Sequence, residues 1–341
     1  MMILCRTRAP AAAALLFCTL AGTAWGQATP APVAPVPPEP QALAKDAWLI
    51  AGGFLPNRQP DGNTVVFKGS QGLVVVDTGR HVWQRQAILA LAKAQDTPIV
   101  AIINSHWHLD HVSGNPDLKA AYPAARVYAS NAIDQALTGF LKDSAADTSE
   151  YLKSATLPPE TAEDIRNDLA TTANGAALKP DVQILASDVL NLAGRRLRVN
   201  LARHGPTAGD VWVVDQHSGI AAVGDLVTLP VPFLDTACVS GWKSALAQVA
   251  ATRFETLVPG HGKPMSRIEF AQYRLAFEAF VDCAHTAQKP AVCATAWANG
   301  VASLLAINSM NPQHAERMAS YYVAEVLRPH GGNSKFCKAG G

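Results

Sequence analysis

The alternation of hydrophobic and polar residues predicts β-strands in the first part of the folded chain. Short runs rich in valine, isoleucine and aromatic residues are separated by glycine, proline, asparagine and aspartate, which is typical of strands and turns. Between the third and fourth of these runs, apolar residues at helical spacing predict a helix over residues 82–94. The predicted strands are residues 48–50, 64–68, 73–76 and 98–104.

The same order of strands and helices continues to the end of the chain. Residues 143–180 are polar and alanine-rich and predict one or two surface helices, either a solvated cover or a lid over a site. Residues 265–327 have helical periodicity. The pattern therefore predicts an α/β fold, with sheet layers covered on the outside by helices. The further predicted strands are residues 126–129, 182–185, 196–202, 211–215, 220–223 and 256–258.

The N-terminal residues have the pattern of an export signal. Arg6 and Arg8 precede an apolar stretch, and residues 24–26 are suited to a cleavage site. We expect residues 1–26 to be a signal peptide, 27–41 a proline- and alanine-rich spacer, 42–265 the main domain, and 266–341 a helical C-terminal extension packed on it. The predicted location is the periplasm or the exterior of the cell.

Cysteine usage agrees with export to an oxidising compartment. Removal of the signal peptide leaves four cysteines, which allow three disulfide pairings. One of these joins Cys283 to Cys293 and Cys238 to Cys337. The spacing of the four residues is not that of a zinc knuckle.

Composition and charge exclude several classes of partner. The chain has 341 residues, 49% of them hydrophobic and 16% charged, with a formal net charge of +1. Such a charge gives no basic surface for nucleic acid. No segment has the apolar length of a membrane span. We expect a small-molecule substrate, and the sequence leaves the oligomeric state open.

One loop concentrates metal-binding side chains directly after a predicted buried strand. His106, His108, Asp110 and His111 form an H-x-H-x-D-H string. Imidazole nitrogen and carboxylate oxygen are suitable ligands for zinc. His106 and His108, two positions apart, can face one point, while Asp110 and His111 face another. This loop can therefore supply ligands to two metal ions.

Three further residues follow other predicted strands and could complete such a site. They are His204, Asp225 and His261. Loops at strand ends gather at one edge of a sheet, so residues distant in sequence can meet there.

With these residues in this order, the chain resembles the metallo-β-lactamase-fold hydrolases over about residues 45–265. The resemblance implies an αββα sandwich with two zinc ions per chain at one edge. It implies that the first zinc is bound by His106, His108 and His204. The second would be bound by Asp110, His111 and His261, with Asp225 bridging the two ions.

The sequence departs from the family pattern at two positions. The family commonly has H-T-x-G-D around the third histidine, whereas here two extra residues follow His204. True β-lactamases of the family usually have cysteine or serine where this chain has Asp225. In addition, His108 stands where the diiron redox branch has glutamate, which favours hydrolysis over electron transfer.

The resulting functional hypothesis is a hydrolase that attacks an ester, lactone, thioester or lactam carbonyl with a metal-bound hydroxide. Asp110 would bind metal and orient this nucleophile. The alternatives are a metallo-β-lactamase acting on antibiotics and a non-catalytic periplasmic zinc-binding protein.

Some residues near these motifs have two interpretations each. Asp77 and Asp210 could brace the ligand loops, although Asp77 could equally cap the helix that follows it. Trp107, Phe233 and Trp242 could line a substrate pocket or pack in the core.

Overall fold

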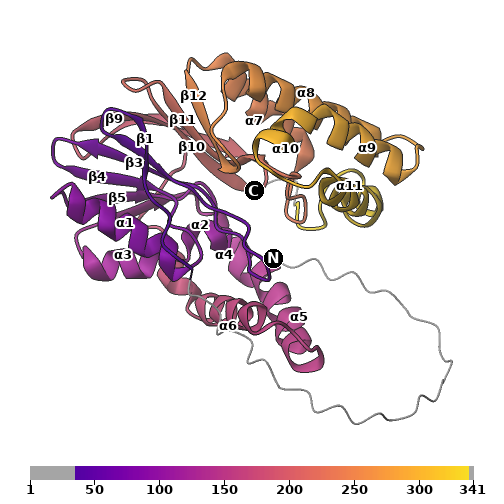
Figure 1. Cartoon of the computed structure of the whole chain (residues 1–341), viewed down its shortest axis with the longest axis horizontal. Helices are drawn as coiled ribbons and strands as arrows, with labels where there is room; N and C mark the ends of the chain where they lie inside the picture. The colour runs from indigo at the N-terminus through magenta and orange to yellow at the C-terminus, as the bar shows by residue number, and fades with distance from the viewer. Residues whose placement is uncertain (1–34, 338–341) are drawn as a thin grey trace, which may run out of the picture. The chain divides into compact units, whose positions relative to one another are not determined.

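Two facing β-sheets form the centre of the protein, with helices on their outer faces (Figure 1). A computed structural model describes residues 35–337. All the helices and strands of these described residues lie in the unit that begins at Pro37. The predicted signal peptide, residues 27–34 of the predicted spacer and residues 338–341 of the predicted extension lie outside the described residues. The αββα layering predicted from the sequence is confirmed.

The first sheet has seven strands among the described residues, in chain order from β1 to β7. Neighbours from β1 to β4 are antiparallel, and those from β4 to β7 are parallel. The strands are β1 (Gln41–Ala44), β2 (Ala47–Ile50), β3 (Thr64–Gly69), β4 (Gly72–Val76), β5 (Ile99–Ile103), β6 (Arg126–Ala129) and β7 (Val182–Gln183).

The second sheet has five strands within the described ranges, in the order β12-β11-β10-β9-β8. Only the pair of β11 and β12 is parallel in this sheet. The strands are β8 (Asp188–Leu192), β9 (Arg195–Arg203), β10 (Gly209–Asp215), β11 (Ile220–Thr228) and β12 (Thr256–His261).

The core between the sheets follows from the two-residue period of a strand. Val65 and Phe67 of β3 face the second sheet, where Val199 and Val213 belong to the same apolar cluster. Val66, between them in sequence, faces the opposite side and packs with the first helix. Both faces of the first sheet are therefore apolar, which explains the continuous hydrophobic runs in the sequence.

Helices cover the outer faces of both sheets. Helices α1 and α3 lie over the first sheet, and α7 and α8 lie over the second (Figure 1). Helix α1 has the bounds that the periodicity predicts. Among the described residues, no helix combines the length and hydrophobicity needed to cross a bilayer. The first seven helices are α1 (Val82–Ala94), α2 (Leu109–Val112), α3 (Asn115–Ala121), α4 (Ala132–Thr138), α5 (Phe140–Ser154), α6 (Pro159–Ala173) and α7 (Val239–Ala251).

The C-terminal region is helical, as its periodicity predicts. Its helices are α8 (Arg267–Ala284), α9 (Pro290–Gly300), α10 (Ala302–Ile307) and α11 (Pro312–Tyr321), followed by a π-helix (Tyr322–Leu327). The disulfide Cys283–Cys293 joins α8 to α9. The disulfide Cys238–Cys337 ties the C-terminal tail to the start of α7. This is the pairing that the sequence left as one of three.

Candidate metal centre

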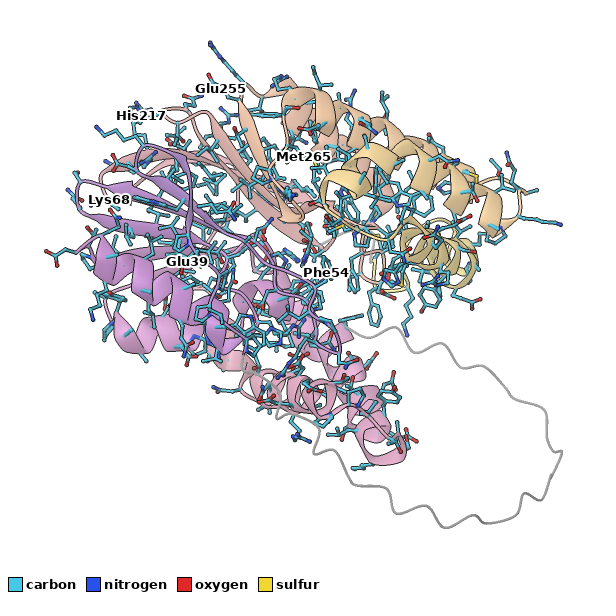
Figure 2. All side chains as sticks on the ribbon, in the orientation of Figure 1. Glu39, Phe54, Lys68, His217, Glu255 and Met265 are labelled. Atoms are coloured by element: carbon cyan, nitrogen blue, oxygen red, sulfur yellow. A yellow bond between two sulfur atoms is a disulfide. The ribbon has the colours of Figure 1, made fainter. Side chains whose placement is uncertain are left out.

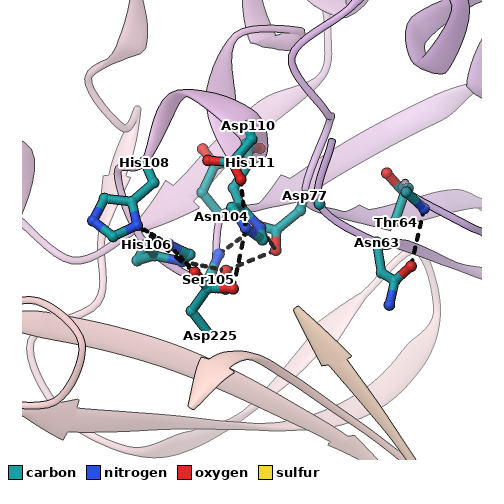
Figure 3. A network of polar contacts seen from close by, with 12 residues as sticks. Asn63, Thr64, Asp77, Asn104, Ser105, His106, His108, Asp110, His111 and Asp225 are labelled. Carbon is teal, nitrogen blue, oxygen red and sulfur yellow. Dashed lines mark hydrogen bonds and ion pairs between the residues drawn. The ribbon is translucent and has the colours of Figure 1, made fainter. Parts of the chain in front are cut away.

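Six of the seven predicted ligand residues meet at one edge of the sheets, beside the ends of β5 and β12 and the later part of β11. Asp77 follows β4, and the histidine loop follows β5 and enters the short helix α2. Asp225 lies in β11, and His261 ends β12. The edge between the two sheets therefore collects side chains as far apart in the sequence as His106 and His261. Figure 3 shows the histidine loop with Asp77 and Asp225.

Two glycines allow the close contacts of β11 and β12 at this edge. Gly224 precedes Asp225 with a φ of 52°, and a Cβ there would lie 2.5 Å from Cβ of Ser105. Gly260 precedes His261, and a Cβ on it would lie 2.0 Å from Oδ1 of Asp225. A larger residue would displace Ser105 at the first position and the predicted ligand Asp225 at the second.

His106, His108 and Asp225 form the first group, and their ligand atoms all lie within 4.8 Å of one another. Nε2 of His106 lies 2.8 Å from Nδ1 of His108. Oδ2 of Asp225 lies 3.5 Å from the former and 3.7 Å from the latter. All three side chains are buried.

Asp110, His111 and His261 form the second group within the same distance limit of 4.8 Å. Nε2 of His261 lies 3.0 Å from Oδ2 of Asp110 and 3.4 Å from Nε2 of His111. Asn63 donates hydrogen bonds to the carbonyls of Pro259 and Gly262 on either side of His261, at 2.9 and 2.8 Å, and so fixes its loop.

Asp225 faces both groups. While its Oδ2 faces His106 and His108, its Oδ1 lies 3.3 Å from Nε2 of His111 and 3.6 Å from Nε2 of His261. This Oδ1 is buried and has no hydrogen-bond partner. A buried carboxylate oxygen without a donor is costly unless a cation balances it.

The donor set and this unpaired oxygen fit a divalent cation in each group. Nitrogen and carboxylate oxygen are the ligands that zinc prefers among hard and borderline donors. In each group, ring nitrogens of two histidines face each other, 2.8 Å apart in the first group and 3.4 Å apart in the second. A cation between facing lone pairs would turn these contacts into stabilising ones.

Hydrogen bonds to the ring nitrogens that point away from the centre hold the histidines in place. Asp77 accepts three bonds through its carboxylate, from the backbone N–H and the hydroxyl of Ser105, both at 2.7 Å, and from Nδ1 of His111 at 2.8 Å (Figure 3). Ser105 in turn lies 2.9 Å from Nδ1 of His106. One carboxylate thus supports a histidine of each group. Asp77 does not cap helix α1, whose N-cap residue is His81.

Thr236 holds His108 in the same way. Its hydroxyl lies 3.1 Å from Nε2 of His108 and donates to the carbonyl of Pro206 at 2.7 Å. With the hydroxyl hydrogen engaged by the carbonyl, Nε2 must be the donor, which leaves Nδ1 free to bind metal. The sequence did not identify Thr236, because its loop carries no metal-ligand motif.

Arg80 is a second residue that the sequence did not identify. Its Nη2 lies 3.6 Å from Oδ1 of Asp110, while Nη1 bonds the carboxylate of Asp168 in α6 and Nε donates to the carbonyl of Pro60 at 3.0 Å. A buried guanidinium is therefore fixed beside one predicted ligand.

The charges of the centre follow from this proximity. Burial raises the pKa of Asp110, but the neighbouring His111, His261 and Arg80 lower it by more, so this pKa lies well below its usual range. The pKa of Asp225 is lowered well below its usual range, since the same two histidines outweigh its burial. Burial and the adjacent His106 lower the pKa of His108 to about 4. Two carboxylates therefore stay ionised and His108 stays neutral, which suits metal binding. Burial lowers the pKa of His111, but the carboxylates of Asp225, Asp77 and Asp110 raise it by more, so without a cation this pKa lies well above its usual value.

His204 belongs to neither group among the described residues. It has a φ of 62° and lies in a tight turn, in which its backbone N–H bonds the carbonyl of Ala208 at 3.4 Å. The two extra residues after His204 form this turn. Its role as a ligand stays a prediction.

Asp210 closes the same turn. Its carboxylate accepts bonds from the backbone N–H and the hydroxyl of Thr207, at 3.0 and 3.1 Å. Burial raises the pKa of Asp210 to about 6. It thus braces the turn that follows His204.

The aromatic candidates divide into two kinds. Trp107 and Phe233 contact the ring of His108, with centroids 4.6 and 4.9 Å away. Trp242 is 0% exposed and packs on Phe277 in the core, so it has no surface to offer a pocket. For Trp242 the packing interpretation describes the structure. A further ring, that of Phe54 (Figure 2), is 51% exposed. Its centroid lies 5.5 Å from that of His261.

Comparison with known proteins gives the same fold. A family profile described as the metallo-beta-lactamase superfamily matches residues 58–261. Among solved structures, the chain is similar to a metallo-beta-lactamase from Pontibacter korlensis, with a TM-score of 0.51 and 17% identity over 70% of this chain and 98% of that one. It is also similar to the stereoselective inverting sec-alkylsulfatase Pisa1 from Pseudomonas sp., with a TM-score of 0.59 and 17% identity over 86% of this chain and 51% of that one.

A curated relative is the linear primary-alkylsulfatase of Pseudomonas sp. (strain ATCC 19151). It is 26% identical over 223 residues, which are 59% of this chain and 41% of that protein. The lactamase-like protein aptB of Emericella nidulans is 33% identical over 84 residues, 24% of this chain and 27% of that protein. The chain thus spans less than half the length of either relative.

Proposed function

The chain belongs to the metallo-beta-lactamase superfamily, and on that premise we propose that it is an exported, binuclear zinc-dependent hydrolase. The observation that carries the proposal is the position of Asp225. One oxygen of its carboxylate faces His106 and His108, and the other faces His111 and His261. A carboxylate placed between two ligand groups is suited to bridging two cations.

His106, His108 and Asp225 would hold one ion, with His204 as a predicted further ligand. Asp110, His111 and His261 would hold the other together with Asp225. When bound, the two ions would supply Lewis acidity and lower the pKa of a water molecule toward neutrality.

The protein's own contribution is orientation. Asp110 is fixed on one side by Arg80 and on the other by His261, at 3.6 and 3.0 Å. Its ionised carboxylate can accept a hydrogen bond from an attacking water molecule and so aim it at the substrate. Asp77, Ser105 and Thr236 keep the ligand histidines in one tautomer and one orientation.

The substrate class follows from the superfamily and from the ligands. We propose an activated carbonyl compound: an ester, a lactone, a thioester or a lactam. β-Lactam hydrolysis is a weaker candidate, because Asp225 stands where β-lactamases of this fold usually have cysteine or serine. Sulfate esters are a second candidate class, favoured by the similarity over 223 residues to a linear primary-alkylsulfatase.

Metal quantification combined with a substrate panel tests the proposal. The mature chain should contain two zinc ions and hydrolyse at least one ester, lactone, thioester, lactam or alkyl sulfate in a chelator-sensitive way. Asp110→Ala should lower turnover by at least about 100-fold, because it removes a ligand and an orienting group. Asp134→Ala, which removes an exposed carboxylate paired with Lys179, should leave turnover unchanged.

The other outcomes separate the alternatives. Cleavage of penicillin or cephalosporin reporters at rates far above those of the other compounds would identify a β-lactamase. Two bound ions without turnover of any compound would identify a zinc-binding protein. A chain that binds no metal would overturn the proposal.

Export is part of the proposal and has its own support. The described residues contain two disulfides, and such bonds persist in oxidising compartments. We expect the protein isolated from its host to begin at Gln27, which N-terminal sequencing would determine. We further propose that residues 42–265 form the hydrolase domain and residues 266–341 an extension of it.

A further inference from the structure

Aromatic rings from three distant segments form a row that starts at His108. The Trp107 ring lies 4.6 Å from that of His108, Phe140 lies 5.6 Å from Trp107, and Phe336 lies 5.1 Å from Phe140. These residues come from the histidine loop, from the start of α5 and from the C-terminal tail. No sequence motif connects them.

A second arm of rings leaves His108 in another direction. Phe233 lies 4.9 Å from His108 and 6.4 Å from Tyr322. Tyr322 is 1% exposed, and its hydroxyl donates to Asp235 at 3.2 Å. The C-terminal region therefore supports both arms of the ring cluster, which we call the aromatic wall: Trp107, Phe140, Phe233, Tyr322 and Phe336.

The wall has an inner and an outer part. Trp107 and Tyr322 are buried, whereas Phe140, Phe233 and Phe336 are only half-buried. Water reaches three phenylalanine rings beside a polar centre, although packing the same rings inward would stabilise the fold. Partly accessible aromatic rings beside a few polar groups are typical of small-molecule sites.

The tail that carries Phe336 is fixed in place. The disulfide between Cys238 and Cys337 ties the residue next to Phe336 to the start of α7. The backbone N–H of Ser334 bonds the carbonyl of Ala237 at 3.0 Å, and the N–H of Val239 bonds Oδ1 of Asn333 at 2.9 Å. The same loop carries Thr236, which bonds His108.

We propose that the aromatic wall binds an apolar group of the substrate, and that Phe336, held by the Cys238–Cys337 disulfide, determines the preference for substrates that carry such a group. The inference rests on the proposed hydrolase function and narrows its substrate class to compounds with an extended alkyl or aryl substituent. The scissile group would lie at the metal centre, and the substituent would lie along the rings beside His108.

Binding of unreactive n-alkyl carboxylates, from acetate to decanoate, tests this inference without turnover. Calorimetry of the zinc-loaded mature chain should show affinity that rises with chain length. Full burial of each methylene corresponds to roughly a fourfold gain, and partial burial to less. Phe336→Ala should weaken decanoate binding by about tenfold and change acetate binding by less than about twofold.

Two variants complete the experiment. Ile268→Ala removes a side chain that is 83% exposed on α8, outside the aromatic wall, and should leave both affinities unchanged. Cys238→Ser with Cys337→Ser frees the tail and should weaken decanoate binding as Phe336→Ala does, with zinc content preserved.

Affinity that is independent of chain length, undetectable for decanoate, or equally dependent on chain length in Phe336→Ala would overturn the inference. The hydrolase proposal would survive those results, because it depends on metal content and turnover. Conversely, binding that depends on chain length without any turnover would support the binding role of the aromatic wall and contradict the proposed hydrolase activity.

Discussion

At the scale of single residues, the candidate metal centre is organised by the ring nitrogens that point away from it. Three of its four histidines have an outer partner among the described residues: Ser105 for His106, Thr236 for His108 and Asp77 for His111. Nδ1 of His261 is buried and has none. Outer partners fix the tautomer and raise ligand basicity. They are therefore the places where a mutation should affect metal binding without removing a ligand.

Asp77→Asn should weaken zinc binding by about 10- to 100-fold. The amide keeps the shape of the carboxylate, but it loses the charge and presents a donor to one of three groups that now donate to it. Competition with a chromophoric chelator measures the affinity. Asp117→Asn, on the surface of α3 beside Arg85, is the control. Equal affinities for the two variants would show that Asp77 does not support the ligands.

Thr236→Val should weaken zinc binding by roughly tenfold, whereas Thr236→Ser should not. Valine has nearly the same shape but leaves Nε2 of His108 and the carbonyl of Pro206 without a partner. The same chelator competition applies, and a thermal melt of each variant checks the fold. If serine fails to restore the affinity, the methyl group and its packing matter, and the hydroxyl does not.

At the scale of elements, helix α6 is attached to the centre by charge. Thr161, Asp164 and Ile165 are its buried residues. Asp164 bonds Arg58 at 2.6 Å and lies 3.1 Å from Nε2 of His81, and Asp168 bonds Arg80. A helix predicted as a cover or a lid thus contacts the residue that fixes Asp110. These contacts fit both interpretations.

This attachment should depend on pH through His81. Burial lowers the pKa of His81, but its bonds to Asp164 and Asp61 raise it by more. Arg58 pairs with the same Asp164, and the backbone N–H of Arg80 bonds Asp61. A histidine with a raised pKa stabilises the fold below its ordinary pKa of 6.5, and this contribution is lost as the pH rises through the raised value. The free energy of unfolding should therefore fall above pH 6.5 by more in the wild type than in His81→Gln.

Urea unfolding at several pH values on both sides of 6.5 measures this difference. His217→Gln, in the turn between β10 and β11 at the other end of the strands (Figure 2), should behave as the wild type does. Parallel curves for the wild type and His81→Gln would contradict the prediction.

Sequence patterns predicted most elements, and the exceptions have a physical reason. The strongly apolar strands and helix α1 were predicted within a few residues of their bounds. Strands β1 (QALA) and β8 (DVLNL) were not predicted. Both lie at sheet edges and have few β-branched residues, so pairing with β2 and β9 determines them.

The residues of the candidate metal centre, too, were predictable only where the signal is local in the sequence. The H-x-H-x-D-H loop could be identified because its chemistry is local in sequence, and predicted strand ends indicated Asp225 and His261. The prediction that Asp225 follows its strand was wrong, since β11 continues to Thr228. Thr236 lies 128 residues from His108, and Arg80 contacts α6 and Asp110 through tertiary packing alone. No periodicity encodes such contacts.

At the scale of the whole molecule, the two disulfides should contribute unequally to stability. Chain entropy predicts about 4.7 kcal/mol for Cys238–Cys337, which closes a loop of 99 residues, and about 2.7 kcal/mol for Cys283–Cys293, with a separation of 10. Double serine variants of each pair, unfolded in guanidinium chloride, compare them. Equal losses, or a larger loss for the shorter loop, would show that native contacts outweigh chain entropy.

Asp77 has a consequence that reaches beyond either metal group. Its carboxylate is bonded to His111 directly and to His106 through Ser105. A cation bound at one group therefore also restrains the carboxylate that orients a histidine of the other group. The conformational entropy lost on the first binding event is then not lost again on the second. The two ions should therefore load cooperatively, and half-filled molecules should be scarce in a titration.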